Sequence, residues 1–150
     1  MPEARARVIL AFDFGLRRIG IASGDTVSGA AAPCAAVQVS DKGIDWSAIE
    51  RLLRQFEPDV LVVGSPRNVD GSAGALSRAS DEFAAELASR SRLAVHRTDE
   101  FASSLEAAGR LKAQRQSGQR RKRIQRTDID SASAAIILER WLSGEGRRDD

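Results

Sequence analysis

The sequence predicts an α/β fold with a five-stranded mixed sheet, in which the early strands are antiparallel and the later ones parallel. Two apolar runs typical of strands, 8–14 and 19–23, are joined by a hairpin-length connection that opens with Gly15. After residue 45, segments with a helical hydrophobic period alternate with short apolar runs. This alternation is typical of helices that connect parallel strands and flank the sheet.

The remaining elements follow in order from residue 30. The run 30–39 predicts an edge strand, because Pro33 interrupts it. Asp45 caps a predicted helix that ends at Glu57-Pro58, and the continuous apolar run 59–64 predicts a strand buried on both faces. The later elements are a loop at 65–74, a helix with Leu76, Ala79, Phe83 and Leu87 on one side, a strand at 93–97, a helix at 101–116, a loop at 117–126 and a helix at 128–142.

Composition indicates one domain over residues 1–150, with frayed tails at 1–6 and 144–150. The apolar share of 42% is ordinary for a globular protein. No apolar run approaches the roughly 20 residues that cross a bilayer, so we expect no membrane association. The single cysteine, Cys34, excludes an internal disulfide and fits a cytoplasmic location. We expect Cys34 to be a buried small apolar residue.

Positive charge gathers in one segment, between Arg110 and Arg126, which contains no acid. Removing its eight basic residues leaves 15 of the 23 bases against 21 acids, so the rest of the chain has a net charge of −6. A cluster of this kind on an acidic body predicts a surface that binds a polyanion. A solvated surface without a binding role is the alternative.

Acids at the ends of strands are the strongest chemical signal. Asp13 lies in a predicted strand whose surroundings are too apolar for an ordinary surface carboxylate. Asp99 and Glu100 follow the strand 93–97, and because neighbours on a strand point in opposite directions, we expect one of them to face the same edge as Asp13. The alternative is that this pair caps the next helix.

A third acid comes from the last predicted helix. At 100° per residue, Asp130 shares a face with Ala134, Ile137 and Trp141, which must pack on the sheet, whereas Asp128 lies about 160° away. Asp130 is therefore the better ligand. The alternative is that Thr127 is the N-cap and Asp130 completes a capping box.

Carboxylates that converge at one edge repel one another and stay ionised when cations bind them. Two oxygen-preferring ions about 4 Å apart can hydrolyse a phosphodiester without a covalent intermediate, so the acids predict Mg²⁺ or Mn²⁺, as two ions. His96 is the only histidine, which makes Ser-His-Asp or Cys-His catalysis a poor alternative.

Four segments of the chain are informative together: AFDFGLRRIGIASGD, VVGSPRNVDGS, the pair Asp99-Glu100 and IDSASAAIILERWL. In order and spacing, over residues 7–143, they resemble the YqgF/RuvX family of bacterial RNase H-like nucleases. The resemblance implies an RNase H-like fold in which Asp13, Glu100 and Asp130 are the catalytic acids and metal ligands, with Asp99 as a further possible ligand.

The resemblance also implies a substrate and residues that bind it. The family is associated with trimming the 5′ end of precursor 16S ribosomal RNA, so the implied partners are structured RNA and pre-ribosomal particles, bound by a monomer or weak homodimer. Arg17 or Arg18 contacts the scissile strand in this interpretation, and Gly15 allows the backbone to approach phosphate. Sequence-independent phosphate contacts come from the basic segment, at Arg120, Arg121, Lys122, Arg123 and Arg126.

Two other functions stay open. The family has also been proposed to resolve Holliday junctions, which implies branched DNA and a stable homodimer, because a resolvase cuts two strands. The family pattern places an arginine after Asp99-Glu100, where this chain has Phe101. Its absence leaves room for a non-catalytic RNA-binding factor in ribosome assembly.

Overall fold

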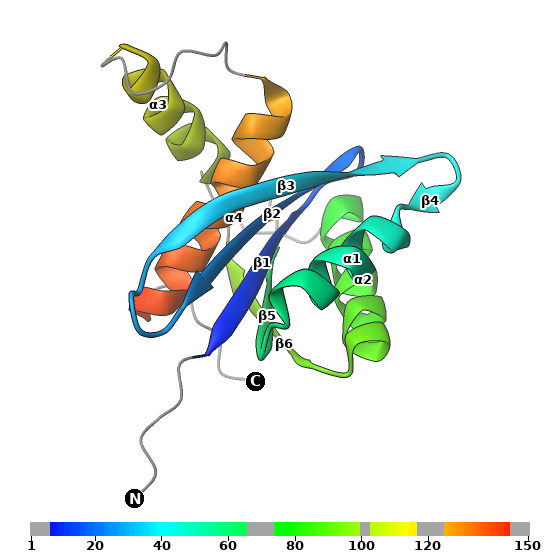
Figure 1. Ribbon diagram of the computed structural model, residues 1–150. Helices are drawn as coiled ribbons and strands as arrows, with labels where there is room; N and C mark the ends of the chain where they lie inside the picture. Colours follow the sequence, from blue (N-terminus) through cyan, green and yellow to red (C-terminus); the bar gives the residue numbers. More distant parts are fainter. Residues whose placement is uncertain (1–6, 66–73, 100–102, 117–124, 145–150) are drawn as a thin grey trace, which may run out of the picture.

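The computed structural model describes residues 7–65, 74–99, 103–116 and 125–144. They form one six-stranded sheet in the order β4-β3-β2-β1-β5-β6 (Figure 1). The strands are β1 (Val8–Phe14), β2 (Arg18–Asp25), β3 (Ala31–Ser40), β4 (Gly43–Ile44), β5 (Val60–Ser65) and β6 (Ala94–Asp99). The helices are α1 (Trp46–Phe56), α2 (Ala75–Ser91), α3 (Ser103–Gln116) and α4 (Arg126–Ser143).

The sheet is mixed in the predicted way. β1 pairs antiparallel with β2 on one side and parallel with β5 on the other, and β5 pairs parallel with β6. The carboxyl ends of β1, β5 and β6 therefore meet at one edge of the sheet. α1 and α2 cover one face, α4 covers the opposite face, and α3 packs against α4 (Figure 1).

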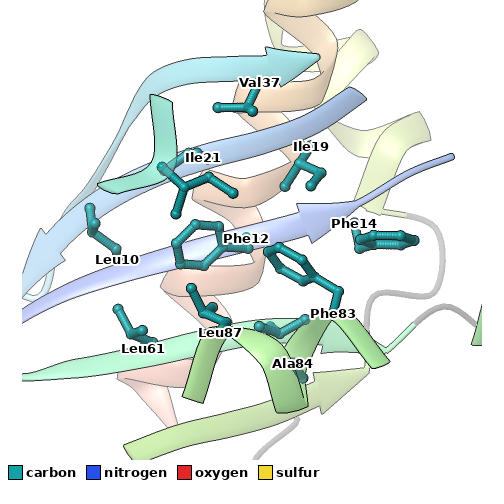
Figure 2. Packing of buried hydrophobic residues seen from close by; sticks show 12 residues of the cluster. Leu10, Phe12, Phe14, Ile19, Ile21, Val37, Leu61, Phe83, Ala84 and Leu87 are labelled. Carbon is teal, nitrogen blue, oxygen red and sulfur yellow. The ribbon is translucent and has the colours of Figure 1, made fainter. Parts of the chain in front are cut away.

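Alternation along β1 divides the core between the two faces. Leu10, Phe12 and Phe14 pack with Phe83 of α2 (Figure 2), whereas Ile9 and its neighbour two positions on pack against α4. Phe12 and Phe83 meet edge to face with ring centroids 5.8 Å apart. Because side chains alternate along a strand, the next position on the α4 face is residue 13.

Two details differ from the sequence-based expectations. The sheet has a sixth strand, β4, because Gly43 at φ 103° closes a tight turn that pairs Val39 with Ile44. Cys34 is exposed rather than buried. It lies in the first half of β3, which β4 does not reach, and this part of the strand forms an edge of the sheet.

Some predictions fall outside the described residues. These are the tail 1–6, most of the loops 65–74 and 117–126, the first two residues of the helix 101–116, and the tail beyond Gly144, which itself caps α4. None of the helices in the described ranges combines the length and the apolar character that crossing a bilayer requires.

A carboxylate organises the turn after β2. The Asp25 side chain accepts hydrogen bonds from the backbone N–H of Ser28 (2.7 Å), the hydroxyl of Ser28 (3.0 Å) and the backbone N–H of Val27 (3.0 Å). The Ser28 bonds, backbone first, lower the pKa of Asp25 below its ordinary value of 3.8, because these donors favour the charged carboxylate.

Asp25→Asn is therefore expected to lower the melting temperature at neutral pH, because the amide keeps an acceptor oxygen but loses the charge. A group whose pKa is lower in the folded protein stabilises it above the unfolded pKa and ceases to do so as pH falls through the folded value. The difference between wild type and variant should shrink below pH 3.8. Thermal unfolding followed by circular dichroism across this range tests it, and a difference independent of pH would contradict it.

Candidate active site

Asp13 stands near the carboxyl end of β1, the strand at which the sheet changes from antiparallel to parallel pairing. In open α/β sheets, ligands bind at this edge where the strand order reverses. Alternation places Asp13 on the α4 face of the sheet with Ile9 and Ala11, and Asp13 is only partly buried. The carboxylate thus faces the helix that carries the second predicted acid.

Gly20 brings α4 against β1 at this point. It lies directly opposite Asp13 in the β1–β2 pair. A Cβ atom added at Gly20 would be 1.9 Å from the backbone carbonyl oxygen of Asp130. Side chains of directly opposed residues have Cβ atoms about 5 Å apart, so the Asp13 Cβ lies within about 7 Å of the Asp130 backbone. The glycine therefore allows the backbone of Asp130 to approach the strand position opposite Asp13.

Asp130 belongs to the buried face of α4, as predicted. Ala134, Ile137 and Trp141 of that face are buried. The predicted alternative, a capping box with Thr127 as N-cap, is wrong. The N-cap is Gln125, whose side chain accepts from the Asp128 backbone N–H, and the Asp128 carboxylate accepts in return from the Gln125 backbone N–H at 2.8 Å. The helix start is satisfied without Asp130.

Arg18 forms an ion pair with Asp130. Its Nε donates to Oδ2 at 2.6 Å, and the two side chains are each 24% exposed. A bond of this length between charged groups is a strong one, and partial burial limits its screening by water. The sequence predicted that Arg17 or Arg18 contacts nucleic acid, and in the structure the Arg18 guanidinium lies on the carboxylate of a predicted metal ligand.

The connection from β1 to β2 lies beside this pair. A Cβ atom at Gly15 would be 2.6 Å from the Arg18 carbonyl oxygen, so glycine is required here by the turn itself. Arg17 is exposed, and Leu16 is exposed to 63%. The connection thus presents one cation and one apolar side chain to solvent at the edge that carries Asp13.

Hydrogen bonds fix the neighbouring strand ends. Arg97 of β6 donates to the buried Ser80 hydroxyl of α2 at 2.9 Å, and Ser80 donates to the Gly64 carbonyl of β5 at 3.2 Å. Arg97 also pairs with Asp81 at 2.7 Å. These contacts join α2 to β5 and β6. Arg97 lies two residues before Asp99, the last residue of β6.

The other predicted site residues lie at the margins of what the structure describes. Asp99 ends β6 opposite Ser65, and Glu100 follows it outside the described residues. Arg126 is exposed at the first position of α4. Outside the described residues are the four cations Arg120, Arg121, Lys122 and Arg123.

The described ranges contain no cluster of three or more His, Cys, Asp or Glu side chains that could coordinate a metal. The third predicted acid, Glu100, is not among these residues. His96 lies on the α4 side, with its ring centroid 5.5 Å from that of Trp141. In the described part of the site, the Asp130 backbone packs on Gly20, the residue opposite Asp13, and Arg18 is paired with the Asp130 carboxylate.

Mutation can distinguish the capping role of Asp128 from the predicted metal-ligand role of Asp130. Asp128→Ala is expected to cost about 1 kcal/mol of stability, since it removes half of the capping box, and to leave the predicted metal-dependent cleavage unchanged. Asp130→Asn is expected to abolish activity with little loss of stability. Urea unfolding and an RNA cleavage assay on both variants test this, and equal activity losses would contradict the assignment.

Solved structures with the same fold include two resolvases. Thermus thermophilus RuvC in complex with a Holliday junction substrate superposes with a TM-score of 0.53 at 14% identity, covering 92% of this chain and 94% of that one. The yeast mitochondrial Holliday junction resolvase Ydc2 gives a TM-score of 0.52 at 12% identity, covering 89% and 77%. The fold therefore belongs to the RNase H-like class that these resolvases share.

Sequence relatives identify the branch of this class. Proteins named "Putative pre-16S rRNA nuclease" from Xylella fastidiosa and Edwardsiella ictaluri are each 40% identical, covering 95% and 94% of this chain and 94% and 98% of the relatives. The RuvX family model, described as Holliday junction resolvase, matches residues 7–144. The chain belongs to the RuvX family, as its motifs predicted.

Proposed function

We propose that this protein is a metal-dependent endonuclease that takes part in 5′-end processing of precursor 16S ribosomal RNA. The observation that carries the proposal is the position of Gly20, which lies opposite Asp13 and against the backbone of Asp130. This contact brings the α4 backbone at Asp130 close to the β1 position that carries Asp13, which supports a shared site for the two acids. The names of the 40% identical relatives favour the ribosomal substrate.

The residues present suit a divalent ion. Carboxylate oxygens are the ligands that Mg²⁺ and Mn²⁺ prefer, and two acids close together in a partly buried place repel unless a cation lies between them. Asp13, Asp130 and Glu100 would hold the metal, with Asp99 as a further ligand, and we propose two ions. Bound there, the ions would activate water and stabilise the leaving oxygen of a phosphodiester.

Basic side chains would bind the RNA backbone. Arg17 is exposed beside Asp13, and Arg126 is exposed at the start of the helix that carries Asp130. The four further cations of the segment 120–123 precede that helix in the chain. Contacts from these side chains to phosphates give affinity that does not depend on base sequence and that weakens with salt.

A second candidate is a Holliday junction resolvase. The description of the family model and the RuvC complex favour it, since both refer to such junctions. A resolvase that cuts two strands needs two active sites, so this function predicts a stable homodimer, whereas the RNA nuclease works as a monomer or weak homodimer. The position of Phe101, where the family pattern has arginine, keeps a non-catalytic assembly factor as a third outcome.

On this proposal the protein acts in the bacterial cytoplasm, where ribosomal RNA precursors and pre-ribosomal particles occur.

One experiment separates the three functions. Precursor 16S RNA with its 5′ extension and a synthetic four-way DNA junction are incubated with the protein in Mg²⁺ or Mn²⁺. RNA cutting supports the proposal, junction cutting alone supports the resolvase, and binding without cutting supports the assembly factor.

A further inference from the structure

Arg18 and a metal ion require the same carboxylate. The guanidinium Nε lies 2.6 Å from Oδ2 of Asp130, the acid that the proposed function assigns to the metal. Two cations on one carboxylate repel each other, and the repulsion is strong where water is partly excluded. Each side chain of the pair is 24% exposed, so the pair is partly shielded but still reachable from solvent.

The surroundings of Arg18 offer it a second partner when nucleic acid binds. Arg18 is the first residue of β2, next to the exposed Arg17, at the edge where a phosphodiester must lie for Asp13 to act on it. A guanidinium has five donors in a planar fork that matches phosphate as well as carboxylate. The guanidinium can therefore offer a phosphate the same kind of donors that it offers Asp130.

We propose that Arg18 couples RNA binding to metal binding by exchanging Asp130 for a phosphate of the RNA backbone. Without RNA, the guanidinium neutralises Asp130 and weakens cation binding there. With RNA bound, the phosphate takes the guanidinium and leaves Asp130 to the divalent ion. The inference rests on the proposed function, since it takes Asp130 as a metal ligand, and it assigns Arg18 as a positioning residue.

This coupling must be reciprocal. If RNA raises the affinity for the metal by some factor, the metal raises the affinity for RNA by the same factor. Couplings between two sites are commonly 5- to 150-fold, and we expect about 10-fold here. If the ion pair only held Asp130 in the correct orientation, removing Arg18 would weaken metal binding. If Arg18 competes with the metal, removing it strengthens metal binding.

The experiment measures Mn²⁺ affinity by calorimetry, with and without an RNA leader made with phosphorothioate linkages to slow hydrolysis. Wild type should bind Mn²⁺ about 10-fold more tightly with RNA. Arg18→Gln should bind it about 10-fold more tightly than wild type without RNA, and RNA should then change little. Arg17→Gln is the comparison variant: it removes the neighbouring charge but leaves the ion pair, so RNA should bind more weakly, whereas the coupling, measured at saturating RNA, should persist.

Arg18→Lys controls for a folding defect in Arg18→Gln. Lysine keeps the positive charge, so this variant should keep a coupling of several-fold. Weaker Mn²⁺ binding in Arg18→Gln, or loss of coupling in Arg17→Gln as well, would overturn the inference. Asp130→Asn, titrated in parallel, separates the two proposals. If Asp130→Asn binds Mn²⁺ as wild type does, the metal assignment fails and the inference with it; if it loses binding while Arg18→Gln gains none, only the inference fails.

Discussion

Asp13→Asn is expected to reduce metal-dependent cleavage by about 10³-fold or more, while the protein stays folded. Mutating a group that only hydrogen-bonds to a metal ligand typically lowers metal affinity or activity 10- to 100-fold, so loss of a ligand itself should lower activity further. The amide has the same shape as the carboxylate but lacks its charge. Its partly buried position at the end of β1 should accept the amide without unfolding.

The measurement is single-turnover cleavage of precursor RNA in Mg²⁺, with the melting temperature recorded for each protein. Asp41→Asn provides a matched control, because it removes the same charge from an exposed turn between β3 and β4. The control should keep wild-type activity. Cleavage by Asp13→Asn at a rate within a few fold of wild type would exclude Asp13 as a metal ligand.

Gly20→Ala is expected to damage both stability and activity, although it adds only a methyl group. The new Cβ would be 1.9 Å from the Asp130 carbonyl oxygen, a backbone atom that cannot rotate away. Overpacking of this kind typically costs 1–3 kcal/mol, and we expect about 3 kcal/mol here. Helix α4 must move outward, which separates Asp130 from Asp13, so cleavage should fall by about 100-fold, as expected for a misplaced catalytic group.

Gly109→Ala is the matched control for this change. Gly109 lies in α3, where an added Cβ would meet nothing within 4 Å, so alanine should stabilise the protein by about 1 kcal/mol. Urea unfolding gives the stabilities, and the RNA assay gives the rates. Gly20→Ala with wild-type stability and rate would show that the close contact between β2 and α4 is not needed.

The strands and the face of α4 were predictable because their patterns are local. The apolar run at Val8–Phe14 predicted β1 to the residue, and the 100° rotation per residue placed Asp130 on the packed face. The helix start was not predicted correctly. Thr127 is a better N-cap type than Gln125, but Asp128 pairs with Gln125 in a reciprocal capping box, which outweighs the preference.

The contacts that bring the site together could not be predicted. Arg18 and Asp130 are 112 positions apart, and no local pattern joins them. A glycine inside a strand, such as Gly20, indicates a close backbone approach, but the sequence does not say which backbone approaches. The two-residue strand β4 is too short to produce any period of its own.

Asp13 and Asp130 are expected to bind the same metal ion or a directly bridged pair. Diffraction from crystals of the protein soaked in Mn²⁺, measured for anomalous scattering, tests this arrangement. We expect a Mn²⁺ peak with oxygen atoms of both carboxylates at coordination distance, about 2.0–2.6 Å. A Mn²⁺ peak that contacts neither carboxylate, with Arg18 still paired to Asp130, would contradict it.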